Sequence, residues 1–205
     1  MDYTLSNLVS TVRKRLKDEE YDEDEIKQFL NEAQSEVLGE DKYPFMQRID
    51  CYDADASGEI DLPIGYGGTV SIFAQREKIP RTILHYIKPE DFFNHRNGHI
   101  WAYTVYGGKI FYHIAGDHND YEIFHLYLAN PRPMVDDDDK PGIPYEYREI
   151  LILGALYRAE RERDNFDYSQ IYQNQQDALI TNMKVRYGQG TLGVNSRSVL
   201  PIRSK

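Results

Sequence analysis

Histidine and carboxylate side chains are the first candidates for chemistry in this sequence. His113, Asp117 and His118 follow one another closely at the mouth of a predicted hairpin, and their nitrogen and oxygen atoms are ligands that a divalent metal accepts. No HExxH motif or comparable ligand spacing accompanies them. We therefore interpret them as strand-surface and loop residues, and we predict neither a metal site nor a cofactor.

Runs of acidic residues offer two further candidates. Asp136 to Asp139 supply oxygen ligands that suit calcium, but the run lacks the spaced ligands, the turn glycine and the distal Glu of an EF-hand loop. We predict a solvated acidic loop. Asp53 and Asp55 are a carboxylate pair of the kind that performs acid-base chemistry on a glycan, without a motif to support that role.

Glycine-rich and nucleophile motifs give no catalytic residues either. The GYGG stretch at 65–68 lacks the Lys-Ser/Thr pair of a phosphate-binding loop and is followed by a strand-like segment. The sequence contains no GxSxG or SxxK motif and no paired Cys/His signature. We predict no catalytic residues and a protein that is not an enzyme.

Charge and cysteine content restrict the partners and the compartment. The net charge is −10, and because residues 188–205 contribute +3, residues 1–187 carry −13, which disfavours binding to a phosphate backbone. The single Cys51 excludes an intrachain disulfide and favours a reducing compartment. The start of the chain lacks a basic segment followed by an apolar one, and no apolar run reaches eighteen residues, so we expect a soluble protein.

Two amphipathic helices are expected near the start of the chain. The first has one apolar face made of Leu5, Leu8, Val9, Val12 and Leu16. The second begins after Asp22, a plausible N-cap with Glu25 three residues on, and we expect Gly39 to cap its end. Its apolar residues are Ile26, Phe29, Leu30, Ala33, Val37 and Leu38.

From residue 43 onward, prolines and glycines punctuate short runs rich in Val, Ile, Tyr and Phe, which predicts strands at 72–75, 82–87 and 121–129. In the clearest hairpin, at 99–116, Gly107 and Gly108 form the turn. A helical turn is predicted at 89–96.

After a proline-rich loop, two more helices are predicted, the first within 145–164 and the second from Tyr168 to about Tyr187. The first has an apolar face that includes Ile150, Leu153, Gly154 and Tyr157. The second has Ile171, Tyr172, Ala178, Leu179 and Met183 in the same pattern.

These elements predict an α+β fold: a bundle of about four helices with a β-rich insertion between two helical pairs. We assign residues 1–44 to the N-terminal pair, 45–130 to the insertion, 131–187 to the C-terminal pair of the same bundle, and 188–205 to an extended arm. Glycines 188, 190 and 193 disfavour helix in the arm.

The order of these segments resembles tailed-bacteriophage head-to-tail adaptor proteins, also called head-completion or connector proteins, which are related to tail tubular protein A of short-tailed phages. The resemblance is carried by YDEDEIKQFLNEAQSEVLGEDKYPF, GEIDLP, LHYIKPEDFF, YTVYGGKIFYHI, YEIFHLYLANP and IPYEYREILILGALYRAERE. It implies a structural protein of the virion neck, assembled in the host cytoplasm, with no membrane partner. The family forms rings of about a dozen copies between the portal and the tail, lining the channel through which DNA passes without specific binding.

The resemblance also implies partners for particular residues. The C-terminal arm of the family docks on the portal protein, so the predicted portal-binding residues are Leu192, Val194, Arg197, Leu200, Ile202 and Arg203. The seventeen tyrosines fit sheet faces and core, or interfaces, where tyrosine is favoured. For the downstream tail or nozzle protein we predict contacts with Tyr103, Tyr106, Lys109 and Tyr112.

Two other functions stay open at this point. One branch of such proteins is associated with peptidoglycan hydrolysis, so a tail-associated hydrolase with a carboxylate site is the alternative. A nucleic-acid-binding module is a third reading, although the acidic charge suits it poorly.

Overall fold

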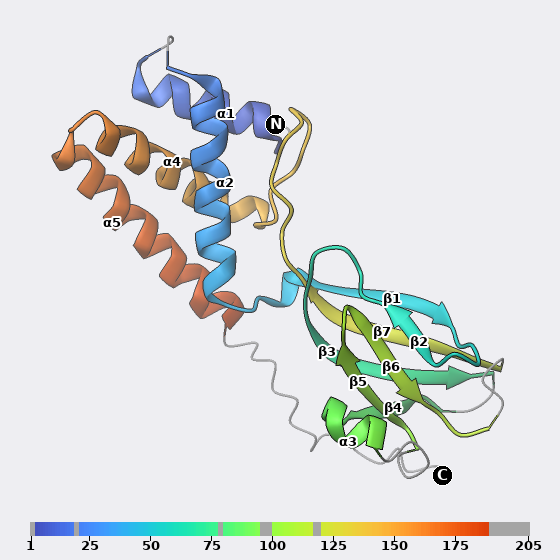
Figure 1. Cartoon of the computed structure of the whole chain (residues 1–205). Helices are drawn as coiled ribbons and strands as arrows, with labels where there is room; N and C mark the ends of the chain where they lie inside the picture. The colour runs from blue at the N-terminus through green and yellow to red at the C-terminus, as the bar shows by residue number, and fades with distance from the viewer. Residues whose placement is uncertain (1–2, 19–20, 78–79, 95–99, 117–119, 189–205) are drawn as a thin grey trace, which may run out of the picture. The chain divides into compact units, whose positions relative to one another are not determined.

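Helices and strands separate into two parts of the chain (Figure 1). The computed structural model describes residues 3–18, 21–77, 80–94, 100–116 and 120–188. A helical unit comprises the chain up to Pro44 and from Pro133 onward, and a β-rich unit comprises Phe45–Arg132. The mixed α+β class predicted from the sequence is confirmed.

The helical unit contains four α-helices, and short 3-10 or π turns adjoin two of them, within its described residues. The helices are α1 (Leu5–Leu16), α2 (Glu23–Glu40), α4 (Arg148–Glu162) and α5 (Phe166–Met183), with the 3-10 turn η3 (Tyr145–Tyr147) before α4 and the π turn η4 (Lys184–Gly188) after α5. Helix α4 packs against α1, α2 and α5, and α1 also packs against α2. A four-helix bundle remains a prediction for this unit.

The first two helices follow the sequence pattern closely. All five apolar residues predicted for α1 are buried, because the three-and-four spacing brings them to one face. Asp22 is the N-cap of α2, and its carboxylate accepts a hydrogen bond from the Asp24 amide at 2.9 Å. The prediction that Gly39 caps the helix is wrong. The helix continues through Glu40, and the C-cap is Asp41 in an extended conformation.

Helix α4 is buried on nearly every side. Its continuous apolar run buries seven consecutive residues, Ile150 to Leu156. Gly154 allows three helices to approach closely, because a Cβ atom there would lie 2.6 Å from Gln176 Nε2 in α5 and 2.7 Å from Ala33 Cβ in α2. Arg158 adds ion pairs to α2, at 3.2 Å from Glu32 and 2.5 Å from Glu36.

Helix α5 differs from the expectation. Of the apolar residues predicted for its packing face, Met183 is buried, but Ile171 is 49% exposed and Ala178 is also exposed. The buried positions are Ser169, Gln176 and Met183, spaced by seven residues. The physical reason is that α5 packs against α4 through its own Ser169, Gln176 and Met183. Its larger apolar side chains therefore stay at least partly exposed to solvent.

The β-rich unit is one curved, nearly closed sheet of seven strands. Its strands are β1 (Gln47–Asp53), β2 (Glu59–Asp61), β3 (Tyr66–Arg76), β4 (Thr82–Tyr86), β5 (Ala102–Tyr106), β6 (Lys109–His113) and β7 (Tyr121–Ala129), and short helical segments are η1 (Pro44–Met46) and α3 (Pro89–Asn94). The spatial order is β1-β7-β3-β4-β5-β6-β2, and β4 and β5 run parallel. The predicted strands are confirmed. The helical turn predicted at 89–96 is confirmed for residues 89–94, and residues 95 and 96 lie outside the described residues.

The predicted hairpin is present as β5 and β6. Tyr106 pairs with Lys109 across the turn, and Gly107 and Gly108 have φ values of 58° and 80°, a conformation that glycine adopts without a steric penalty. Alternate residues of the hairpin point into a core shared with β3 and β7. This core includes Ile72, Ala74, Leu84, Tyr103, Ile110, Tyr112, Tyr121 and Ile123.

Candidate functional site

The candidates for metal or acid-base chemistry have structural roles where they are described. His113 stacks on Phe92, with ring centroids 4.5 Å apart, whereas Asp117 and His118 lie outside the described residues. Within the part of the chain that the structure describes, no group of three or more His, Cys, Asp or Glu side chains is arranged to hold a metal ion.

Asp55 organises the turn between β1 and β2. Its Oδ1 accepts hydrogen bonds from the Ser57 amide at 2.9 Å and from the Gly58 amide at 3.2 Å. Asp53, the other carboxylate of the proposed pair, ends β1 and is exposed. The carboxylate of Asp55 therefore serves the backbone of a tight turn.

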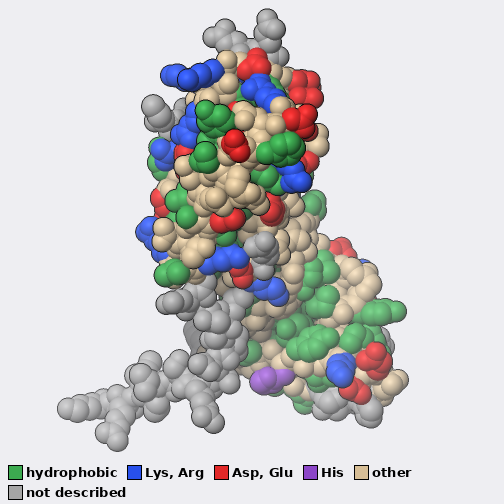
Figure 2. Space-filling model, turned by 90° about the vertical axis from the view of Figure 1, so that its left-hand side faces the viewer, with side chains coloured by type: hydrophobic (Ala, Val, Ile, Leu, Met, Phe, Trp, Pro, Cys, Tyr) green, Lys and Arg blue, Asp and Glu red, His purple; other side chains and the backbone are tan. Residues whose placement is uncertain are grey.

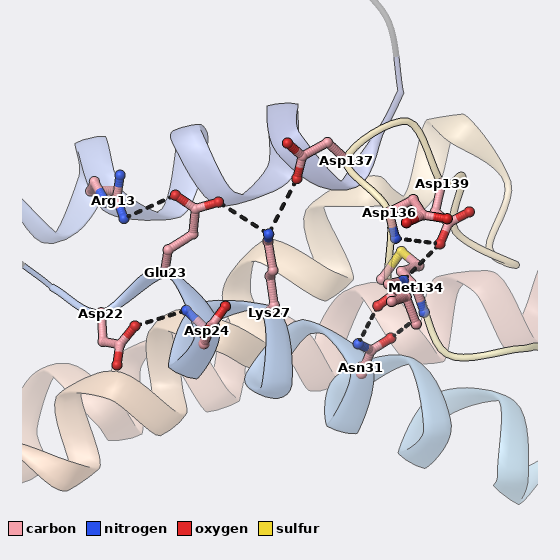
Figure 3. A network of polar contacts seen from close by, with 11 residues as sticks. Arg13, Asp22, Glu23, Asp24, Lys27, Asn31, Met134, Asp136, Asp137 and Asp139 are labelled. Carbon is pink, nitrogen blue, oxygen red and sulfur yellow. Dashed lines mark hydrogen bonds and ion pairs between the residues drawn. The ribbon is translucent and has the colours of Figure 1, made fainter.

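Asp136, Asp137 and Asp138 are exposed and Asp139 is partly buried, and hydrogen bonds and an ion pair hold this run against the helices (Figure 3). The backbone oxygens of Asp137 and Asp139 accept the first amides of α1, from Ser6 at 3.1 Å and from Leu5 at 2.9 Å. These are amides that a helix start leaves without an internal partner. The run therefore caps α1.

Side chains complete this arrangement. Asn31 of α2 donates to the Met134 oxygen at 2.9 Å and accepts from the Met134 amide at 2.8 Å. Lys27 lies 3.2 Å from the Asp137 carboxylate (Figure 3). The amides of Val135 and Asp136 donate to the Asp139 carboxylate, which lowers the pKa of that carboxyl group. The loop thus fastens α1 to α2.

Two of the four hairpin residues predicted to bind the tail protein lie in the core of the β-rich unit. Tyr103 and Tyr112 are 8% and 1% exposed. Burial raises the pKa of Tyr103 to about 12, and the Tyr112 hydroxyl accepts a hydrogen bond from the Asp55 amide at 3.0 Å. Their structural role is to hold the hairpin to the core.

The other two residues lie on the surface at the hairpin turn. Tyr106 is 62% exposed, and the Lys109 Nζ atom lies 2.8 Å from the Glu59 carboxylate in β2. Tyr106 and Lys109 are cross-strand partners, so the structure brings these two predicted residues together.

Further apolar side chains lie on the strands and loops next to the hairpin. The Phe93 ring lies 6.0 Å from that of Tyr106, and the backbone just before Ile64 is fixed to the turn by a hydrogen bond from Leu62 to Gly108. Ile64 is 82% exposed, and Tyr86, which contacts Tyr103, is 56% exposed. We name Ile64, Tyr86, Phe93 and Tyr106 the hairpin-tip surface. Figure 2 shows hydrophobic side chains gathered over the face of this unit that it draws.

The second exposed apolar surface lies on α5. Spacings of three and four residues place seven side chains along one side of the helix, next to the buried positions, with Tyr172 and Leu179 only partly exposed. We name this set the outer face of α5: Tyr168, Ile171, Tyr172, Gln175, Ala178, Leu179 and Asn182. None of these side chains carries a charge at neutral pH. Figure 2 views the side of the helical unit on which α5 lies in Figure 1, and it shows hydrophobic side chains among charged ones there.

The number of charged residues in α5 predicts this surface better than the spacing of its apolar residues does. Helix α5 has two charged residues among eighteen, Asp167 and Asp177, whereas the equally long α2 has seven. An exposed helix ordinarily carries charged residues on its solvent side. The scarcity of charge on α5 therefore distinguishes its exposed side from the solvent side of an ordinary surface helix.

A buried histidine of the β-rich unit is hydrogen-bonded to a neighbouring strand. His125 of β7 is fully buried, and its Nε2 lies 3.0 Å from the hydroxyl of Thr69. Burial lowers the pKa of His125 to about 4, although the nearby Asp50 carboxylate acts in the opposite direction. The ring stacks on Tyr127 with centroids 4.9 Å apart. His125 is therefore neutral at pH 7.

With these surfaces described, the comparisons with known proteins identify the class. Residues 3–197 match the family described as SU10 adaptor protein, so the chain belongs to this family of phage adaptor proteins. The family consists of structural components of the virion. No curated protein matches the chain. None of the helices among the described residues is long and apolar enough to cross a membrane. The six predicted portal-binding residues lie outside the described residues.

Proposed function

We propose that this chain is the structural adaptor of a phage neck, assembling in the host cytoplasm as a ring of about a dozen copies that joins the portal vertex to the tail. The observation that carries the proposal is the family match over nearly the whole chain. Two exposed apolar surfaces on separate units give the chain the contacts that such an assembly needs. The order of elements further supports a relationship with tail tubular protein A.

The charge of the chain suits a channel through which DNA must pass without being trapped. Residues 1–187 carry a net charge of −13, which repels a phosphate backbone. DNA is therefore a passing molecule in this proposal and not a bound partner. No membrane partner or cofactor enters the proposal.

The tail or nozzle protein is proposed to dock on the hairpin, with Tyr106 and Lys109 in direct contact. Tyr103 and Tyr112 support that contact from the core. The double variant Tyr106→Ala, Lys109→Ala should still load onto portal-bearing heads but fail to join tails, because the changed side chains lie outside the core. Loss of head loading with tail joining intact would reverse the assigned polarity.

The arm at 188–205 is proposed to dock on the portal through Leu192, Val194, Arg197, Leu200, Ile202 and Arg203. Each buried apolar side chain contributes roughly 1.5–3 kcal/mol before ordering costs, and the basic side chains supply steering. A chain that ends at Tyr187 should retain its circular dichroism spectrum but fail to load onto portal-bearing heads. Normal loading of the shortened chain would contradict this role.

Electron microscopy of portal-bearing heads with and without the full chain tests the proposed function itself. We expect a ring of density beneath the portal in the first sample and none in the second. Heads that remain unchanged after incubation with the folded chain would contradict the proposal.

A further inference from the structure

We infer that the outer face of α5 packs against α1 of a second copy of this chain, so that each copy uses both helices in two different contacts. The inference rests on the proposed ring and names the surfaces through which neighbouring copies meet. A contact between two different surfaces continues from copy to copy and closes when the rotation between copies allows a ring.

The surface of α1 has the shape to receive a helix. A groove of about 900 Å³ lies along one side of α1, where Val9 is among its lining residues. A second groove of about 650 Å³ lies along its other side and is lined by parts of α1, η3 and α4. Both grooves share Ser10 and Lys14, so the exposed ridge of α1 rises between them.

Apart from Lys14, the side chains of this ridge are small. Ser6 and Ser10 lie four residues apart and share one side of α1, with Asn7 and Thr11 beside them. Small side chains allow the axis of a second helix to come close. The larger residues of the α5 face, such as Tyr168 and Tyr172, have the size to enter the grooves on either side.

Charge favours this pairing of helices. Helix α1 carries three basic residues and no acidic one, whereas α5 carries two acidic residues and no basic one. Lys14 and Asp167 make no ion pair with any other described residue. Two copies of an acidic chain repel one another over most of their surface, and α1 against α5 joins opposite signs.

The acidic helix α2 is the competing electrostatic partner for α1, but its exposed residues do not provide apolar anchors. Its apolar residues Ile26, Leu30, Ala33 and Val37 are buried within its own unit. The outer face of α5 combines the favourable charge with apolar area, and buried apolar area supplies most of the affinity at protein interfaces.

Matching the charges sets the direction of the two helices. With Asp167 of one copy beside Lys14 of the next, an antiparallel arrangement brings Ile171 near Ser10, because both helices advance four residues between these positions. Gln175 then lies near Ser6. This register specifies which side chains a cross-linker should join.

Cross-linking of assembled rings tests the inference. In a Cys51→Ser background, the pair Ser10→Cys and Ile171→Cys is treated with a short bis-maleimide on portal-bearing heads. We expect a ladder of dimers, trimers and larger species, because every copy offers two different thiols to two neighbours. The matched control replaces Ile171→Cys by Gln170→Cys, which is exposed on another side of α5, and should remain monomeric.

Single variants separate the alternatives. Dimers from Ile171→Cys alone would mean that two α5 faces meet, and this would overturn the inference. Rings that are visible by electron microscopy but give no ladder would also overturn it while leaving the proposed function intact. Absence of rings from unmodified chain and heads would instead contradict the proposed function on which the inference rests.

Charge reversal provides a second test that avoids new cysteines. Lys14→Glu should reduce ring assembly on heads, and combining it with Asp167→Lys should restore assembly, because the attraction is re-formed with the signs exchanged. Both side chains are exposed, so the fold should tolerate the changes. Assembly that is unaffected by Lys14→Glu, or not restored in the double variant, would contradict the assigned register.

Discussion

Helices α4 and α5 follow one another in the chain and pack together, yet they relate to solvent in opposite ways. Helix α4 buries nine of its fifteen residues, whereas α5 buries three of eighteen. Both contain large apolar side chains. The difference lies in where those side chains point, since α4 lies among three helices and α5 contacts chiefly α4.

This contrast shows that an apolar pattern on a helix does not by itself predict burial within the same chain. Ile150 of α4 is fully buried, while Ile171 of α5 is half exposed. An exposed helix that also lacks charge is suited to a partner that arrives later. We therefore propose that α4 stabilises the unit and that α5 mediates its assembly.

Substituting one isoleucine in each helix should affect the free energy of unfolding very differently. Ile150→Ala should lower the free energy of unfolding by roughly 2–5 kcal/mol, because it removes buried methyl groups and leaves a cavity. Ile171→Ala should change it by no more than about 0.5 kcal/mol, as expected for a surface position. Urea unfolding followed by circular dichroism measures both. Equal changes in the free energy of unfolding would contradict the different burial of α4 and α5.

The stability of the β-rich unit should depend on pH because His125 is buried in it. The folded pKa of His125 is about 4, below the value of about 6.5 expected in the unfolded chain, so the unfolded chain binds more protons at acid pH. The contribution of neutral His125 to the free energy of unfolding is therefore fully present above about pH 6.5 and is lost as the pH falls through about 4. The loss amounts to roughly 3 kcal/mol.

The fluorescence of Trp101, the single tryptophan, reports on this unit during denaturation at pH 7.5 and at pH 4.5. His125→Gln should flatten the dependence on pH because the side chain no longer titrates in this range. A variant that keeps the full acid sensitivity would show that another group is responsible.

Gly154 in α4 and Gly39 in α2 differ in how much space surrounds them. Gly154→Ala should destabilise the chain by roughly 1–2 kcal/mol, because overpacking against Ala33 outweighs the better helix propensity of alanine. Gly39→Ala is the matched control in α2, where a Cβ atom would meet nothing within 4 Å, and it should stabilise the chain by up to about 1 kcal/mol. Thermal unfolding compares them. A stabilising Gly154→Ala would mean that α4 is less tightly enclosed than described.

Local patterns were sufficient to predict most elements of this fold. The N-cap at Asp22, the buried face of α1 and the Gly107–Gly108 turn follow from side-chain hydrogen bonding, helical spacing and backbone freedom. These are properties of a few neighbouring residues. They are therefore visible in the sequence before any tertiary contact is known.

Features that depend on distant segments were not predictable in this way. Gly39 remains helical, and the loop at 136–139 caps α1 although more than a hundred residues separate them. The burial of Tyr103 and Tyr112 depends on the curvature of the whole sheet. One side of α5 is exposed because the apolar residues of α4 are buried mainly against other helices and α5 contacts α4 through Ser169, Gln176 and Met183.

Hydroxyl-radical footprinting of the outer face of α5 is the most direct test of the division between a stabilising and an assembling helix. Tyr168 and Tyr172 should be oxidised in the free chain and protected in the assembled neck, whereas Tyr147, which is buried, should react little in either state. Mass spectrometry locates the modified residues. Equal oxidation of Tyr168 and Tyr172 in the free and assembled states would contradict the account.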